Sequence, residues 1–406
     1  MRALLSDNPL FEVFGQRALT QAVFRGSDFG ECVTTIERVG EGTVDDWHRE
    51  WVATANRVES IGDDAAAAGH AVSAREAFLR ASTYYRTAYF PLFGAPVDPR
   101  LVDAFQRETA AFRKACPLFE PPIDPLEIPF GGASLPGYFV RAGPDDRPRP
   151  TIVHVNGYDS NIQEVYFAHA PAATPRGYHC LLVDGPGQGR NLIRDGIHVR
   201  PDWEQVVGAV IDHALTLPGV ERDRLVLAGW SFGGFLAPRA AAFESRIAAL
   251  VADPGQWDQR DAILGTLPLA DDEKARFPDI DPGRLAPMEE WLRGPDADPL
   301  VRWRVLQRGL WVHGKDTVFD YFADLCRYEL SPVADRIAAP TLVTAAEGDP
   351  IAAGAPKLYE AIPAERKKLV HFTAAEGAGG HCEGLARTLY HQRVFDWLDE
   401  TLTLAG

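Results

Sequence analysis

The sequence predicts an α/β protein that combines a mostly parallel sheet with a helical N-terminal region and an inserted helical cap. After about residue 120, short apolar runs alternate with helical patterns, whereas the preceding residues carry helical patterns alone. A stretch rich in tryptophan, proline and charge interrupts this alternation from about Gln256 to Asp335. Strands that alternate with helices form parallel sheets covered on both faces. We therefore expect a helical region over 1–120, a sheet domain over 121–255 and 336–406, and a helical cap over 256–335.

Three helical patterns occur in the N-terminal region. Apolar residues recur at helical spacing at Trp47, Trp51, Ala55 and Val58. Ala71–Tyr89 is rich in alanine, arginine and aromatic residues, and Pro99–Ala115 forms the third pattern. The segment Pro117–Pro125 holds four prolines and is expected to be the hinge to the sheet domain. The helical region is a candidate cap and a candidate surface for a homodimer.

Seven apolar runs predict the strands of the sheet domain. They are Leu135–Val140, Thr151–Val155, Cys180–Val183, Leu225–Ala228, Ala248–Ala252, Thr341–Ala345 and Lys368–Phe372. Helical patterns lie between most of them, at Trp203–Leu217, Phe235–Phe243 and Gly384–Leu402. This order of elements is typical of a parallel sheet with helices on both faces.

Composition argues against several classes of partner. Lysine and arginine number 41 and aspartate and glutamate number 57, which gives a net charge of −16. Such a balance disfavours nucleic acid and anionic membranes as partners. The five cysteines are widely spaced and form no CxxC pair, so neither a disulfide framework nor a zinc site is expected. Neither a signal peptide nor a membrane span is recognisable, which makes a cytoplasmic location the expectation.

The strongest motif is Gly229–Gly234, in which Ser231 has the pattern G-x-S-x-G. It follows the predicted strand Leu225–Ala228 and precedes the predicted helix Phe235–Phe243. In that context the pattern indicates a nucleophile elbow, a sharp turn that presents the serine at the carboxyl edge of the sheet. Glycines on both sides remove the Cβ atoms that would collide in the turn. We therefore expect Ser231 to be the nucleophile of an α/β-hydrolase fold.

A serine nucleophile requires a neighbouring base, which in this fold follows the last strand. His381 lies on a glycine-rich loop between the strand Lys368–Phe372 and the terminal helix, where that base is expected. Three other histidines fit less well, because His154 and His371 lie within predicted strands and His391 lies within a helix.

The third member of a catalytic triad orients the imidazole and stabilises its charged form. Asp349 follows the predicted penultimate strand Thr341–Ala345, and the chain order Ser231, Asp349, His381 is the order typical of the fold. Glu347 is an alternative in the same loop. Asp253 is another, because it ends the strand that follows the nucleophile.

Two backbone N–H groups are expected to form the oxyanion hole. One belongs to Phe232, the residue after the nucleophile. The other is assigned to Tyr158, which follows the strand Thr151–Val155 and the small residue Gly157. A further glycine-rich segment, Asp184–Arg190, has the spacing G-x-G-x-G and not the dinucleotide fingerprint, so we expect a tight loop near the active site there.

Several of these segments together resemble the FrsA-like α/β-hydrolases. They are the triad region, His154–Ser160, Asp184–Gly189, Ala237–Glu244, Ser73–Tyr85 and Leu135–Phe139, so the resemblance covers most of the chain. The family includes esterases and enzymes that hydrolyse a carbon–carbon bond beside a carbonyl. In one of the latter an additional acidic residue from the region after the nucleophile helix assists, and Asp253 or Asp258 is the counterpart that the resemblance suggests. Arg190 departs from the serine often found after such a glycine loop.

The resemblance and the motif together imply a serine hydrolase that cleaves a bond next to a carbonyl. The expected bond is a C–C bond of a bulky aromatic or polyketide-like ketone, and the alternatives are a carboxylesterase or lactonase and a non-catalytic binding protein. The intact triad argues against the last. No cofactor or metal is implied, and the expected partner is a small-molecule substrate. Aromatic residues of the predicted cap are expected mostly in its core, with a few lining an apolar pocket: Trp257, Trp291, Trp303, Trp311, Phe319, Tyr321 and Phe322.

Overall fold

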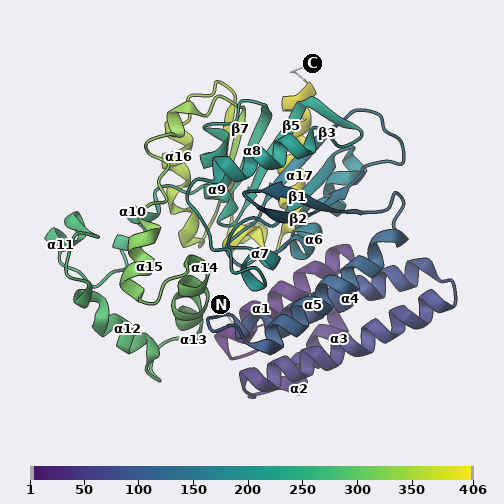
Figure 1. The fold of residues 1–406 in the computed structure, drawn as a ribbon, viewed down its shortest axis with the longest axis horizontal. Coiled ribbons are helices and arrows are strands. Elements are labelled where there is room, and N and C mark those ends of the chain that lie inside the picture. The colour runs from purple at the N-terminus through teal and green to yellow at the C-terminus, as the bar shows by residue number, and fades with distance from the viewer. Residues whose placement is uncertain (1–3, 404–406) are drawn as a thin grey trace. The chain divides into compact units, whose positions relative to one another are not determined.

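A computed structural model of the chain describes residues 4–403. The chain divides into two compact units, each with its own packing (Figure 1). The first unit comprises the residues up to Asp124 together with Tyr166–Pro171 and Trp291–Trp311. The second comprises Pro125–Val165, Ala172–Glu290 and the chain from Val312 onward. The segment predicted as a cap therefore contributes to both units.

The second unit is built on an eight-stranded sheet with the order β1-β2-β4-β3-β5-β6-β7-β8. The strands are β1 (Asp124–Phe130), β2 (Ala133–Val140), β3 (Arg149–Val155), β4 (His179–Val183), β5 (Val220–Trp230), β6 (Ile247–Asp253), β7 (Thr341–Ala346) and β8 (Lys367–Phe372). β2 pairs with β4 in antiparallel orientation, and β4, β3, β5, β6, β7 and β8 pair in parallel. The predicted α/β-hydrolase fold with a mostly parallel sheet is confirmed. The edge strand β1 was not predicted.

The helices of the second unit cover the sheet and include several short elements of the predicted cap. The longer ones are α6 (Ile162–Ala173), of which part belongs to the first unit, α8 (Trp203–Ala214), α9 (Gly233–Ala241) and α17 (Arg387–Thr403). The shorter ones are α7 (Gly189–Ile193), α10 (Gln259–Leu264), α11 (Asp271–Arg276), α12 (Ala286–Arg293), α14 (Leu310–His313), α15 (Val318–Leu325) and α16 (Ala355–Ala361). The helices α12 and α14 are divided between the two units, and α13 (Pro299–Arg302) belongs to the first unit.

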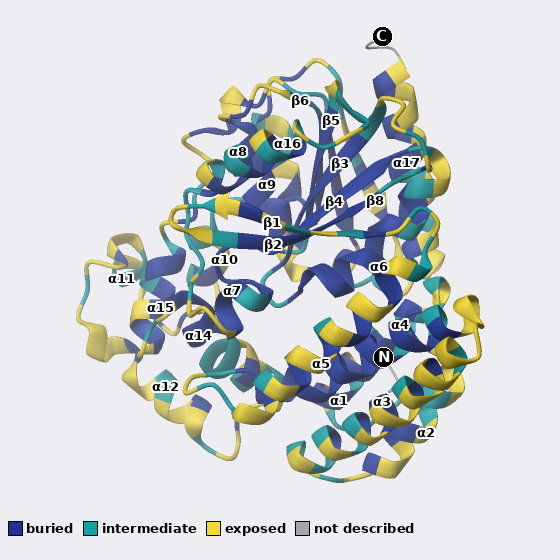
Figure 2. Cartoon of the chain, turned by 45° about the vertical axis from the view of Figure 1, so that its right-hand side comes forward, coloured by how far each residue is buried: buried dark blue, intermediate teal, exposed yellow. Residues whose placement is uncertain are grey.

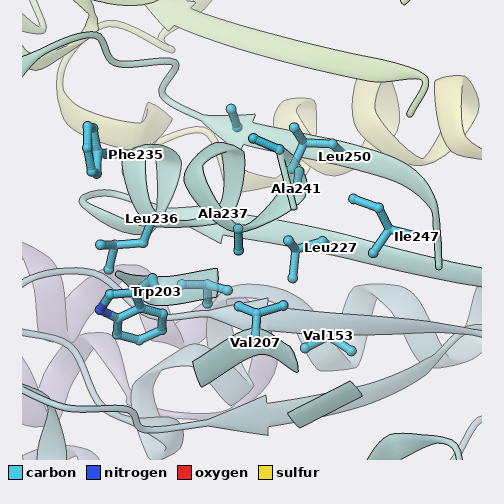
Figure 3. Close-up of a cluster of buried hydrophobic side chains, with 14 of the residues drawn as sticks. Val153, Trp203, Val207, Leu227, Phe235, Leu236, Ala237, Ala241, Ile247 and Leu250 are labelled. Atoms are coloured by element: carbon cyan, nitrogen blue, oxygen red, sulfur yellow. The ribbon is translucent and has the colours of Figure 1, made fainter. Parts of the chain in front are cut away.

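An apolar core lies between the sheet and the helices α8 and α9 (Figure 3). Side chains of β3, β5 and β6 meet those of both helices there, and the labelled members are Val153, Trp203, Val207, Leu227, Phe235, Leu236, Ala237, Ala241, Ile247 and Leu250. Burying one large aliphatic or aromatic side chain stabilises a protein by roughly 1.5–3 kcal/mol. The strand β5 and the helix α9, which flank Ser231, are thus fixed by the same apolar cluster.

The first unit is a helical layer of α1 (Pro9–Thr20), α2 (Phe29–Val39), α3 (Val44–Ala67), α4 (Ala71–Tyr89) and α5 (Pro99–Ala115). Aromatic rings connect the helices: Phe11 stacks on Trp47 at 4.6 Å, and Trp51 lies 5.5 Å from both Trp47 and Tyr84. Trp303 belongs to this unit and donates a hydrogen bond from its indole N–H to the Phe90 carbonyl at 3.0 Å.

The degree of burial differs between the central strands and the edge strand, and among the aromatic residues predicted for the cap (Figure 2). The central strands are buried along most of their length, whereas in β1 exposed positions alternate with half-buried ones and one buried residue, Ile128. Of the aromatic residues predicted for the cap, Trp291 is exposed and Trp257 is half-buried, and the other five are buried. Among residues 4–403, no helix is long and apolar enough to cross a membrane.

Candidate active site

Ser231 occupies a strained turn between β5 and α9. Its φ is +58°, in the left-handed region that residues with a Cβ rarely adopt. Two hydrogen bonds hold the turn: the Ser231 N–H donates to the Asp253 carbonyl at 2.6 Å, and the Gln256 side-chain amide donates to the Ser231 carbonyl at 2.5 Å. The backbone is therefore fixed from both sides, as a nucleophile elbow requires.

The glycines around Ser231 are required by close backbone contacts. A Cβ on Gly229 would lie 1.9 Å from the Gly233 carbonyl oxygen, and one on Gly233 would lie 2.2 Å from the Val155 carbonyl oxygen. A Cβ on Gly234 would lie 2.1 Å from the Pro254 carbonyl oxygen. The glycine pattern therefore allows β5 and α9 to approach the neighbouring strand ends within van der Waals contact.

His381 lies directly beside Ser231. Its Nε2 is 2.8 Å from Ser231 Oγ, within hydrogen-bond distance. The residue begins a short turn, His381–Glu383, after the glycine-rich loop, and the Gly380 N–H anchors that loop by donating to the Glu347 carbonyl at 2.8 Å. The imidazole is 42% exposed, so one face remains open to a reactant.

Asp349 binds the other nitrogen of the imidazole. Its Oδ2 lies 2.8 Å from His381 Nδ1, and its Oδ1 accepts the Ile351 N–H at 3.0 Å. The carboxylate is 1% exposed. Burial raises the pKa of Asp349, but hydrogen bonding and attraction to His381, with N–H groups of Ile351 and Cys382, outweigh burial and lower that pKa below its usual value. The acid is therefore held as a carboxylate facing Nδ1.

The two residues expected to supply the oxyanion hole lie together next to the serine. A Cβ on Gly157 would lie 2.8 Å from Ser231 Cβ and 3.2 Å from Ser231 Oγ, so the loop that carries Tyr158 passes directly beside Ser231. The rings of Tyr158 and Phe232 meet edge to face at 5.0 Å. Phe232 is the N-cap of α9, and its N–H therefore has no acceptor within the helix.

Comparison with known proteins connects this geometry to a family. The sequence profile described as "Alpha/beta hydrolase family" matches residues 152–388, which include all three residues of the candidate triad. The chain belongs to the α/β-hydrolase family. A second profile, "Esterase FrsA-like", matches residues 36–256 and confirms the resemblance found in the sequence.

Relatives of this hydrolase span nearly its whole length. Hydrolase LUC6 of Fusarium sp is 32% identical over 415 residues, which cover 95% of this chain and 94% of the relative. The 20-hydroxy-prefusarin hydrolase FUS2 of Gibberella moniliformis is 30% identical over 420 residues, which cover 96% of this chain and 95% of the relative. The solved structure of 2,6-dihydroxy-pseudo-oxynicotine hydrolase superposes with a TM-score of 0.73 at 24% identity, and the match covers 95% of this chain and 96% of that one. At this identity the likeness concerns the fold alone. The chain is thus an enzyme of the hydrolase class.

A buried polar network clamps the Tyr158 loop of the hydrolase. The Gln188 amide donates to the carbonyls of Asn156 and Gly157 at 2.8 and 3.0 Å, and its oxygen accepts the Gly185 N–H at 2.9 Å. The Asn156 amide donates to Asp184 at 2.6 Å. The glycine-rich segment 184–190 therefore lies against the site as a tight loop, but sequence reasoning did not single out Gln188, because nothing in the local pattern indicates which carbonyls a glutamine will reach.

The remaining acidic candidates lie elsewhere. Asp253 pairs with Arg387 at 2.9 Å and is fully buried, so that only its backbone carbonyl contacts Ser231. Asp258 accepts the N–H groups of Leu330 and Ser331 at 2.6 and 2.8 Å and fixes that loop. Glu347 accepts the Ala374 N–H at 2.8 Å.

Two alternatives to this site find no support within residues 4–403. His154 is buried in β3, where desolvation, with a contribution from the charge of Arg387, lowers its pKa to about 3 and keeps it neutral. Within residues 4–403, no group of three or more histidine, cysteine, aspartate or glutamate side chains is arranged to hold a metal ion.

Proposed function

We propose that this hydrolase uses Ser231 as a nucleophile, His381 as a general base and then a general acid, and Asp349 to orient the imidazole. The observation that carries the proposal is the continuous relay of two 2.8 Å contacts from Ser231 Oγ through His381 to Asp349. Such a relay removes the serine proton as the oxygen attacks a carbonyl, and the buried carboxylate stabilises the imidazolium that forms.

The reaction proceeds in two halves. Ser231 Oγ bonds to the substrate carbonyl carbon while its proton passes to His381 Nε2, and the N–H groups of Phe232 and Tyr158 stabilise the resulting oxyanion. Collapse of this intermediate breaks the bond to the leaving group, which takes the proton from His381 and leaves an acyl-enzyme. Water then attacks the acyl carbon and gives a proton to His381. Collapse of this second intermediate breaks the bond to Ser231 Oγ, which takes the proton back from His381 as the acid is released.

We further propose that the bond cleaved is a carbon–carbon bond beside the carbonyl of a bulky aromatic or polyketide-like ketone. A carbanion is a poor leaving group unless conjugation stabilises it or a proton reaches it as it departs, and His381 Nε2 holds that proton next to the reacting carbon. Two related proteins are named for 20-hydroxy-prefusarin and 2,6-dihydroxy-pseudo-oxynicotine, which favours a substrate of similar bulk.

Ester or lactone hydrolysis is the second candidate, because the same relay serves an alkoxide leaving group. The description of the matching profile as esterase-like favours it. The two candidates differ in their products: a diketone gives an acid and a smaller ketone, whereas an ester gives an acid and an alcohol.

Product analysis by mass spectrometry distinguishes the two. The wild type and Ser231→Ala are incubated with aryl diketones, naphthopyrones, lactones and simple esters of matched size. We expect the wild type to convert at least one diketone or naphthopyrone to an acid and a ketone faster than any ester, and Ser231→Ala to convert none. Turnover confined to esters or lactones rejects the carbon–carbon proposal, and unchanged turnover by Ser231→Ala rejects the role of Ser231.

A further inference from the structure

A buried arginine connects the turn that carries His381 to the turn that carries Ser231. Arg387 opens α17, and its side chain is 8% exposed. Its Nη1 donates to Asp253 Oδ2 at 2.9 Å and to the Cys382 carbonyl at 2.9 Å. Since the Asp253 carbonyl accepts the Ser231 N–H at 2.6 Å, one chain of contacts runs from the residue after His381 to the nucleophile.

A second carboxyl group shares this arginine. Glu383 is 0% exposed, as is Asp253, and its Oε2 lies 3.8 Å from Arg387 Nη1. Asp253 has a donor for each oxygen, Arg387 for Oδ2 and the Thr344 hydroxyl for Oδ1 at 3.0 Å. Within residues 4–403, the Glu383 oxygens receive no hydrogen bond from a donor group. Two buried carboxyl groups thus face one guanidinium charge.

The balance of charge places a proton on Glu383. Burial raises the pKa of Glu383 well above its usual value, the negative charge of Asp253 raises it further, and Arg387 offsets only part of this effect. A protonated Glu383 donates a hydrogen bond to Asp253. The other ionisable groups that face it are Asp349 beyond β7, whose charge also raises this pKa, and Cys382 and Tyr390, which burial keeps neutral.

The backbone of this turn needs such support. Cys382 and Glu383 are consecutive non-glycine residues with φ of +53° and +48°, both in the left-handed region. Residues persist in this conformation only where the surroundings fix them, and such strain is concentrated at functional sites. The hydrogen bond from Arg387 to the Cys382 carbonyl lies directly at the strained peptide.

We infer that Arg387, Asp253 and Glu383 form a positioning cluster that holds His381 against Ser231, in which Arg387 requires one carboxylate as its counter-ion and the other carboxyl group keeps its proton. The inference rests on the proposed roles of Ser231 and His381 for its effect on reactivity. It assigns Asp253 and Glu383 to positioning and not to contact with substrate. Either carboxyl group alone is able to act as the counter-ion of Arg387, but loss of both leaves the buried guanidinium charge without a carboxylate.

The test compares Glu383→Gln, Asp253→Asn, the double variant and Arg387→Met, with Arg246→Met as a control that breaks an ion pair at the opposite end of β6. The first measurement is the infrared difference spectrum between the wild type and Glu383→Gln at neutral pH. We expect a carboxylic acid band that belongs to the wild type alone. Its absence overturns the inference whatever the reactivity of the protein.

The second measurement is the rate at which a fluorophosphonate labels each variant between about pH 6 and pH 10. Each single carboxyl variant is expected to slow labelling by less than about tenfold, and the double variant and Arg387→Met by more than about 1,000-fold, because an unpaired buried charge is far costlier than a lost pair member. The wild type is expected to lose reactivity at alkaline pH as Glu383 ionises, and Glu383→Gln to lose it less.

The inference is overturned if the fold-reduction in labelling rate of the double variant equals the product of the two single reductions. It is also overturned if the labelling rate of Glu383→Gln falls at alkaline pH as much as that of the wild type. If the double variant does not fold, the inference is still tested by the infrared band and by the alkaline labelling rate of Glu383→Gln. A wild type that shows the band but is not labelled contradicts the proposed function and supports the proton assignment, so the two failures are distinguishable.

Discussion

Replacing Asp349 by asparagine tests the contacts from Ser231 through His381 to Asp349, because it changes one side-chain oxygen to an NH₂ group. The Ile351 N–H binds Asp349 Oδ1 at 3.0 Å and leaves Oδ2 facing His381 Nδ1 at 2.8 Å. An asparagine keeps its oxygen toward the Ile351 N–H, because the reverse orientation sets two donors against each other. Its NH₂ group then faces Nδ1, which must become an acceptor. The proton moves to Nε2, where the ring no longer accepts the proton of Ser231.

The expected loss follows from this change of tautomer. A reduction of about 10⁴-fold in rate is typical when asparagine replaces the acid of a Ser-His-Asp triad. At about 1.36 kcal/mol for each factor of ten, this corresponds to about 5.4 kcal/mol of transition-state stabilisation. The assay is the second-order rate of fluorophosphonate labelling, with circular dichroism to verify the fold.

Asp253→Asn is the matched control, because it removes a buried carboxylate at the end of a neighbouring strand without touching the imidazole. We expect Asp349→Asn to be slower than Asp253→Asn by at least about 100-fold, since only the former changes the tautomer. A crippled Asp253→Asn beside a mild Asp349→Asn would refute the assignment of the acid.

Three further substitutions test the packing and hydrogen bonding around Ser231, one of them, in α8, as a control. Gly234→Ala, whose Cβ would lie 2.1 Å from the Pro254 carbonyl oxygen, is expected to lower the melting temperature strongly or prevent folding. Gly208→Ala in α8 meets nothing within 4 Å and is expected to stabilise the fold by about 1 kcal/mol in a denaturant titration, so equal effects of the two alanines would contradict the packing described. Gln188→Glu sets a carboxylate against the carbonyls of Asn156 and Gly157, and we expect kcat to fall by about 10–100-fold with KM little changed, because a buried unsatisfied group costs about 1–3 kcal/mol. A rise in KM alone would instead place Gln188 in substrate binding.

Local patterns sufficed to predict the elements that support the candidate triad. The strands β3 to β8 and the helices α4 and α5 carry strong apolar periods, and the structure has them within a few residues of the predicted bounds. The neighbourhood of Ser231, His381 and Asp349 also followed from sequence, because each residue lies on the connection after a strand of the parallel sheet: Ser231 directly after β5, Asp349 shortly after β7 and His381 on the glycine-rich loop after β8. These connections begin at the same edge of the sheet.

Two of the elements that escaped prediction did so for opposite physical reasons. The edge strand β1, Asp124–Phe130, contains two prolines and buries only Ile128, so it lacks the continuous apolar run of a buried strand. Nearly all of α6, Ile162–Ala173, is buried, and a helix that is buried on every side has no polar face to reveal its period.

The positioning cluster was beyond sequence reasoning because it depends on distant residues. Asp253 and Arg387 are 134 positions apart, and their pairing exists only once β6 and α17 have packed. The sequence offered Asp253 as a possible acid near the substrate, whereas in the structure its side chain is directed into the ion pair beneath His381. Charge on a single residue does not reveal whether its partner is an arginine or a substrate.

The most direct test of the central claim is peptide mapping by mass spectrometry after treatment with a fluorophosphonate. The nucleophile of a serine hydrolase bonds covalently to phosphorus and loses its proton to the neighbouring imidazole. We predict one adduct per chain, located on Ser231 and absent from Ser231→Ala, which retains the melting temperature of the wild type. An unmodified wild type, or an adduct on any other residue that persists in Ser231→Ala, would contradict the account.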